Sequence, residues 1–166
     1  MKRKDIVIGL VLIVLLAGII YIRQRSKPEE ELVVPETLSS EETFEEKFNI
    51  QIPDDADKAD LKEVEGSGGT GIATKEVDSG KFNHNVLVDL PDPEGGYFYE
   101  GWLVKGEEGE EDYSLISTGK LRLAKGGWML DYSSSTDLSD YSKVIVSLEK
   151  TFDKNIEKKV LEGSFN

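Results

Sequence analysis

The chain has 166 residues and a net charge of −13, with 33 acidic and 20 basic side chains. This length suits one modest domain with appendages, and the acidity excludes nucleic acid as a favoured partner because phosphate binding needs clustered Lys and Arg. The chain has no cysteine and a single histidine, His84, which excludes disulfides, thiolate zinc sites, a cysteine nucleophile and a histidine-rich metal site.

The N-terminal part predicts a membrane anchor. Residues 1–5 form a short basic tail, and residues 6–22 follow without a charge. As a helix this run is about 25 Å long, close to the ~30 Å hydrocarbon core of a bilayer. A cleavable signal peptide is the alternative, but the run exceeds a usual h-region and no small-x-small cleavage site follows it before Arg23. We therefore expect an uncleaved, single-pass transmembrane signal anchor.

The charges around residues 6–22 leave the orientation balanced. Three basic residues lie on each side of the apolar run: Lys2, Arg3 and Lys4 before it, and Arg23, Arg25 and Lys27 after it. The free α-amine favours a cytoplasmic N-terminus, and long domains translocate largely regardless of charge. We expect the C-terminal domain to be extracytoplasmic.

Residues 23–42 are predicted to form an acidic linker with little apolar surface to bury. A short amphipathic helix is expected near its end, where Ser39 precedes a run of glutamates and Phe44 and Phe48 lie four residues apart. Its apolar stripe needs a surface to cover, so residues 43–70 are expected to dock on the domain.

Within this docked segment, residues 54–65 are acidic, with a weak helical spacing of apolar residues. Residues 66–71 are rich in glycine and lack the ending of a phosphate-binding loop, so they predict a flexible joint.

Residues 71–166 predict an all-β domain. Strand signals recur at short intervals with Gly, Pro, Asp and Ser turns between them. The expected strands are 72–77, 85–90, 95–105, 114–118, 119–124, a strand beginning at Trp128, 143–149 and 158–165. About six to eight short strands indicate a β-sandwich or a barrel, and we expect the sandwich.

The central strand of this domain is expected at residues 95–105. Alternation places Glu100 and Trp102 on one apolar face, with Tyr99 and Gly101 on the other. Gly101 predicts a bulge or a closely packed neighbour. Glu100 has two interpretations: a rim position or a pair with Lys or Arg, or a carboxylate whose pKa is raised in an apolar site, which would make it a candidate functional group.

The candidate binding surface comprises Glu100, Trp102, Trp128, Asp137 and Asp140. Both tryptophans are expected to be largely buried in neighbouring parts of one hydrophobic cluster, and a surface position would instead favour binding. Asp137 and Asp140 lie in a Ser-rich loop that offers oxygens to calcium, but ordinary turn chemistry explains them better. No Gly-x-Ser-x-Gly elbow, His-Glu-x-x-His helix or EF-hand loop occurs, so we expect no cofactor, no metal and no enzymatic activity.

Three motifs in order, at residues 97–104, 117–121 and 143–149, resemble the extracytoplasmic domain of anti-sigma-K-type factors, which shows a Y-x-x-W-L-V strand, an x-G-x-L strand and a V-x-V-T-L-E strand. The match covers about half of the chain, residues 86–165. The resemblance implies a β-sandwich held outside the membrane by one helix. Members of that family bind a sigma factor through a cytoplasmic helical domain, often with His and Cys zinc ligands.

Only residues 1–5 precede the predicted membrane segment, so direct binding of a sigma factor is not expected. The expected function is a non-enzymatic binding or signalling role that acts through a protein partner in the cell envelope. The alternative is a structural or adhesive envelope protein without a signalling role.

Overall fold

A computed structural model of the chain describes residues 39–64 and 66–165. These residues belong to one compact unit, Leu38–Asn166. The predicted basic tail, the membrane segment at residues 6–22 and nearly all of the predicted acidic linker lie outside the described residues. In the part of the chain that the structure describes, no helix is both long and apolar enough to cross a membrane.

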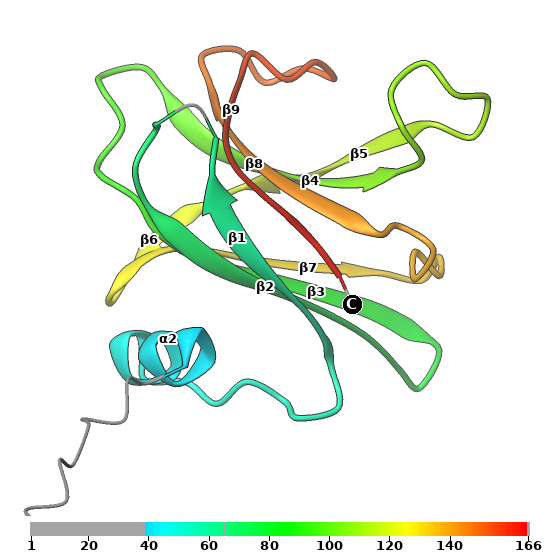
Figure 1. The fold of residues 1–166 in the computed structure, drawn as a ribbon, viewed down its shortest axis with the longest axis horizontal. Helices are drawn as coiled ribbons and strands as arrows, with labels where there is room; N and C mark the ends of the chain where they lie inside the picture. Colours follow the sequence, from blue (N-terminus) through cyan, green and yellow to red (C-terminus); the bar gives the residue numbers. More distant parts are fainter. Residues whose placement is uncertain (1–38, 65, 166) are drawn as a thin grey trace, which may run out of the picture. The chain divides into compact units, whose positions relative to one another are not determined.

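The described unit is mostly β, as predicted, with nine antiparallel strands and one helix (Figure 1). The strands are β1 (Asp57–Glu63), β2 (Thr70–Asp78), β3 (Lys81–Asp89), β4 (Phe98–Lys105), β5 (Ser114–Lys120), β6 (Arg122–Ala124), β7 (Gly127–Ser134), β8 (Lys143–Glu149) and β9 (Lys158–Ser164). They form one sheet in the order β5-β4-β8-β9-β1-β2-β3-β7-β6.

This sheet curls almost into a barrel, where two separate sheets were expected for a sandwich. β5 and β6 stand at opposite ends of the strand order, yet only Leu121 separates them in the chain. The two halves are continuous because β1 pairs on both sides: residues 57–61 pair with β2, and Lys62 and Glu63 pair with β9. β1 thus occupies the middle of the sheet.

β1 is not among the strands expected from the sequence. Residues 54–65 have a weak helical spacing of apolar residues, but Asp57–Glu63 is a strand in which Ala59 and Leu61 are buried. Alternating burial of this kind is the pattern of a strand with one face in the core. Ala59 and Leu61 join the main core with residues of the facing strands, among them Val86, Leu130 and Val146.

The expected amphipathic helix is confirmed as α2 (Ser40–Phe48). Ser39 and Glu42 form a reciprocal capping box at its start, and Phe44 and Phe48 are buried against Ile72 and Leu87 of β2 and β3. The helix comes close to the β6–β7 hairpin, because a Cβ on Gly126 would lie 2.5 Å from the main-chain oxygen of Lys47.

β4 is covered on both faces, as its composition predicts, but it is the second strand of the order and is not central. Its register with β5 shifts between Gly101 and Trp102. A Cβ on Gly101 would lie 2.7 Å from Thr118 Oγ1. The expected bulge and the expected close neighbour are therefore both present.

Candidate functional site

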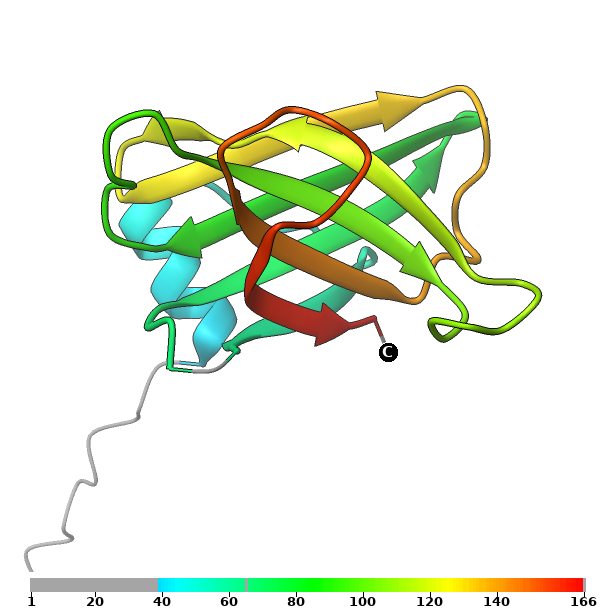
Figure 2. The same ribbon diagram turned by 90° about the horizontal axis from the view of Figure 1, so that it is seen from above.

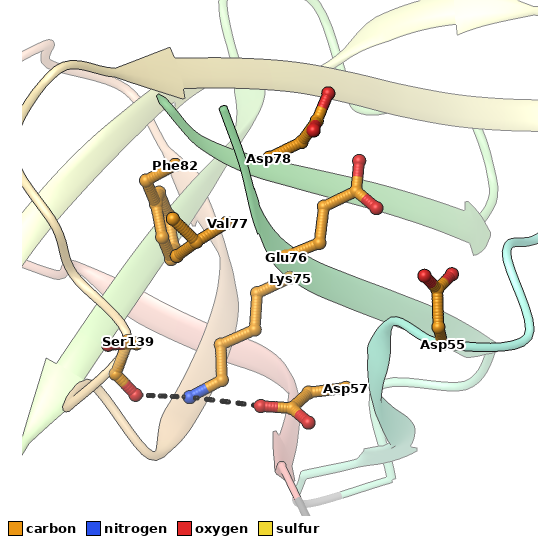
Figure 3. Close-up of a pocket in the computed structure, with 8 residues that line it drawn as sticks. All are labelled: Asp55, Asp57, Lys75, Glu76, Val77, Asp78, Phe82 and Ser139. Atoms are coloured by element: carbon orange, nitrogen blue, oxygen red, sulfur yellow. Dashed lines mark hydrogen bonds and ion pairs between the residues drawn. The ribbon is translucent and has the colours of Figure 1, made fainter. Parts of the chain in front are cut away.

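A pocket of about 330 Å³ lies at the end of β2, beside the loop that follows β7 (Figure 3). We call it the acidic pocket, and it is lined by Asp55, Asp57, Lys75, Glu76, Val77, Asp78, Phe82 and Ser139. Four carboxylates against one ammonium leave three excess negative charges around this space.

Lys75 is the deepest charged group of the pocket, with only 6% of its surface exposed. Its Nζ donates hydrogen bonds to the main-chain oxygens of Ser139 at 2.6 Å and Tyr141 at 2.9 Å. Burial lowers the pKa of the Lys75 ammonium, and the nearby carboxylate of Asp57 opposes that shift. Two of its three N–H donors therefore anchor the loop to the sheet.

The carboxylates reach the pocket from two sides. Asp55 and Asp57 come from the turn before β1 and from its first residue, whereas Glu76 and Asp78 come from the last residues of β2. Glu76 and Asp78 point away from Lys75 and Val77 (Figure 3), as side chains of alternate residues in a strand must. The Nζ of Lys75 lies 3.9 Å from the carboxylate of Asp57.

His84 lies on β3, the strand that pairs with β2. It faces Lys75 across the β2–β3 pair and is fully buried. Its Nδ1 lies 2.8 Å from the oxygen of Thr74, and burial lowers its pKa to about 4. The imidazole is therefore neutral at physiological pH, and Nδ1 carries the proton that is donated to Thr74.

Two of the predicted site residues, Asp137 and Asp140, lie near this end of the sheet. Both carboxylates act on the Lys75 ammonium through their charge. Asp137 accepts a hydrogen bond from the Ser139 amide at 2.9 Å, and Asp140 forms an ion pair with Lys105. These are the turn and surface contacts that ordinary loop chemistry provides.

Glu100 and Trp102 lie elsewhere, on the outer face of β4. A loop at residues 150–157, which we call the cover loop, passes over this face (Figure 2). Ile156 of that loop packs against the cluster of Trp102, Val104 and Ile145. Trp102 is 1% exposed, and its Nε1 donates a hydrogen bond to Ser147 Oγ at 2.7 Å.

Glu100 is fully buried beside Trp102, which rules out a rim position. Burial raises the pKa of its carboxyl, the charge of Glu149 adds to that shift, and a hydrogen bond from Ser117 opposes it. Its Oε2 has no hydrogen-bond partner. The buried position and the upward shift of the pKa are those of the second interpretation, but Glu100 does not line the acidic pocket, and its role as a functional group stays a prediction.

Trp128 does not join Trp102, contrary to the expected single cluster. Trp128 is half-buried against the main core, where its ring meets Tyr99 edge to face at 5.5 Å. Because Trp102 and Tyr99 differ by an odd number of positions along β4, they face opposite sides of the sheet. Trp128 packs on the Tyr99 side, so the sheet separates the two tryptophans.

Sequence reasoning did not identify the residues of the acidic pocket. The available signal was Lys75, which shares one face of a strand with the apolar residues Ala73 and Val77, since a lysine is rarely buried without partners. A second signal was the run Asp78-Ser79-Gly80-Lys81, which is typical of a two-residue hairpin turn. In the structure its two central residues have positive φ and close the β2–β3 hairpin beside the pocket.

No cluster of three or more His, Cys, Asp or Glu side chains that could hold a metal ion occurs in residues 39–64 and 66–165. Comparisons of the chain with protein-family models, with curated proteins and with solved structures find no match. The resemblance to anti-sigma-K-type extracytoplasmic domains therefore rests on its three sequence motifs alone.

Proposed function

We propose that this chain is a membrane-anchored, extracytoplasmic binding module without enzymatic activity, and that the acidic pocket receives a cationic group of its ligand or partner. The observation that carries the proposal is the excess of four carboxylates over one ammonium around a concave space of about 330 Å³. Clefts lined by one sign of charge concentrate ligands of the opposite sign.

Lys75 does not make the pocket suitable for an anion. Two of its N–H donors are directed to the oxygens of Ser139 and Tyr141, and the carboxylate of Asp57 lies next to its ammonium. An arriving carboxylate or phosphate would meet the field of four acidic groups before it reached Lys75. A guanidinium or ammonium group would be attracted by the same field.

A nuclear magnetic resonance titration of the full-length chain in detergent micelles tests this proposal. The probes are N-acetyl-arginine amide and its uncharged isostere N-acetyl-citrulline amide. Backbone signals of Asp57, Asp78 and Ser139 should shift with the arginine probe alone. The double substitution of Asp57→Asn and Asp78→Asn should abolish these shifts. Equal shifts with both probes, or shifts spread over the whole surface, would contradict a site for cations.

The membrane anchor is supported by the uncharged run at residues 6–22. Protease added to spheroplasts should release the domain by cutting within residues 28–40. Digestion that occurs only after lysis would reverse the proposed orientation. The alternative role, a structural or adhesive envelope protein, predicts the same release but no saturable binding of the arginine probe.

A further inference from the structure

The strand β2 is longer than its neighbour β1 at the end that borders the acidic pocket. The pairing of β1 with β2 ends at Asp57 and Lys75. The pairing of β2 with β3 on its other side continues to Asp78 and Lys81. Residues 76–78, which we call the overhang, therefore have a strand on one edge and none on the other.

The overhang is accessible from solvent. Lys75 is buried, Glu76 is half-buried, and Val77 and Asp78 are exposed, with 49% of the Val77 surface accessible. An unpaired strand edge presents N–H and C=O groups that can pair with an added strand.

The acidic pocket lies along this open edge. Lys75 and Val77 belong to one face of β2 and Glu76 and Asp78 to the other, yet all four line the same space (Figure 3). A cavity that contacts both faces of a strand must pass around its edge, because a single face presents only alternate residues. The acidic pocket therefore occupies the position beside residues 76–78 where a further strand would lie, in line with β1.

The charges at this edge decide what such a strand can be. A second copy of this acidic chain, paired through the same edge, would bring its own Glu76 and Asp78 against those already present, and like charges directly opposite each other destabilise a strand pair. A segment with Arg or Lys opposite Glu76 and Asp78 and an apolar side chain opposite Val77 would match the edge in charge and in hydrophobicity.

We propose that the overhang binds an extended basic peptide segment as an additional antiparallel strand, with two basic side chains opposite Glu76 and Asp78. This inference rests on the proposed function, since one of the basic groups occupies the acidic pocket. Main-chain hydrogen bonds give such strand addition its affinity, and alternate side chains give it specificity.

The test uses the full-length chain in detergent micelles and the peptide acetyl-Thr-Arg-Val-Arg-Thr-amide. Two further peptides carry a single N-methyl group, on the valine amide or on the second arginine amide. In an added strand only alternate amides face the sheet. One methylated peptide should therefore bind about tenfold or more weakly, since it loses a hydrogen bond and gains a clash. The other should match the parent peptide within about twofold.

Binding of N-acetyl-arginine amide distinguishes the proposed cation site in the acidic pocket from the proposed addition of a strand. If it binds and both methylated peptides bind as the parent does, the acidic pocket takes cations but strand addition is overturned. If neither the arginine probe nor any peptide binds, both proposals fall. The substitutions Glu76→Gln and Asp78→Asn should weaken peptide binding. Glu108→Gln and Glu111→Gln, in the loop between β4 and β5, remove the same charge and should leave it unchanged.

Discussion

The backbone N–H of Glu157 donates to both carboxylate oxygens of Glu149, at 3.1 Å each. Glu157 in turn accepts hydrogen bonds from the amides of Lys150 and Thr151 at 3.0 Å. The cover loop is thus closed at its base by two carboxylates. The loop lies over the face of β4 that holds Glu100. Near this face the Nζ of Lys120 lies 3.6 Å from the centroid of the Phe98 ring, as a cation–π contact.

The first prediction is that the free energy of unfolding falls as the pH rises above about 4.5. Burial raises the pKa of Glu100 and of Glu149 above their ordinary value of 4.5. The folded chain therefore keeps protons that the unfolded chain releases, and the stability that this provides is present below pH 4.5 and lost as the pH rises through the folded pKa values.

Urea unfolding between pH 4.5 and 8 measures this dependence. Glu100→Gln removes one of the two groups, so the difference between wild type and variant should change with pH, with the variant gaining on wild type at the alkaline end. The same substitution at exposed Glu111 is the control for overall charge. A difference that stays constant over the whole range would mean that Glu100 is not protonated preferentially in the folded state.

Trp102→Ala should cost about 3–5 kcal/mol, the usual range for a buried large aromatic residue. The indole lies at 1% exposure and donates to Ser147 Oγ. Trp128→Ala should cost less, because Trp128 is only half-buried. Chemical denaturation of the two variants compares these losses directly, and equal losses would show that the cover loop contributes little around Trp102.

The position of the two tryptophans illustrates what the sequence does and does not predict. Alternation along residues 95–105 correctly predicts that both faces of β4 are covered. It cannot show what covers each face, because the outer cover is the loop at residues 150–157, whose only large apolar side chains are Phe152 and Ile156. A short loop carries no periodicity that identifies its partner strand.

β1 shows a different limit. Its residues alternate between buried Ala59 and Leu61 and exposed charged side chains, but its five charged residues among seven mask that pattern in the sequence. Strand propensity is low for Asp, Lys and Ala, and pairing on both sides overrides it. The acidic pocket could not be predicted without β1, because Asp57 is the first residue of β1 and Lys75 lies opposite it on β2.

A third prediction concerns the close contact between the paired strands β9 and β1. A Cβ on Gly163 would lie 2.5 Å from the main-chain oxygen of Asp60 and 2.9 Å from Leu61 Cδ2. Gly163→Ala must therefore push two neighbouring strands apart and should cost about 1–3 kcal/mol, as overpacking does. Gly95→Ala is the matched control, since nothing lies within 4 Å of its added methyl group. Thermal unfolding should show a lower midpoint for the first variant and no change for the second.

The last prediction distinguishes a cation site from an anion site by whether the substitution Lys75→Met strengthens or weakens ligand binding. Lys75→Met removes the ammonium and leaves a side chain of similar length in the pocket. The carbonyls of Ser139 and Tyr141 lose their donor, so the variant should be less stable by about 1–3 kcal/mol. Its acidic pocket, however, holds four carboxylates without an opposing charge.

N-acetyl-arginine amide should therefore bind Lys75→Met more tightly than wild type, because the repulsion from the ammonium is gone. A pocket that uses Lys75 to hold a carboxylate or a phosphate predicts the reverse, with binding of inorganic phosphate to wild type and its loss in the variant. Titrations at a temperature well below the unfolding midpoint of the variant keep the comparison within the folded state. Weaker binding of the arginine probe by a folded variant would show that Lys75 orders the pocket through Ser139 and Tyr141 more than it opposes a cation.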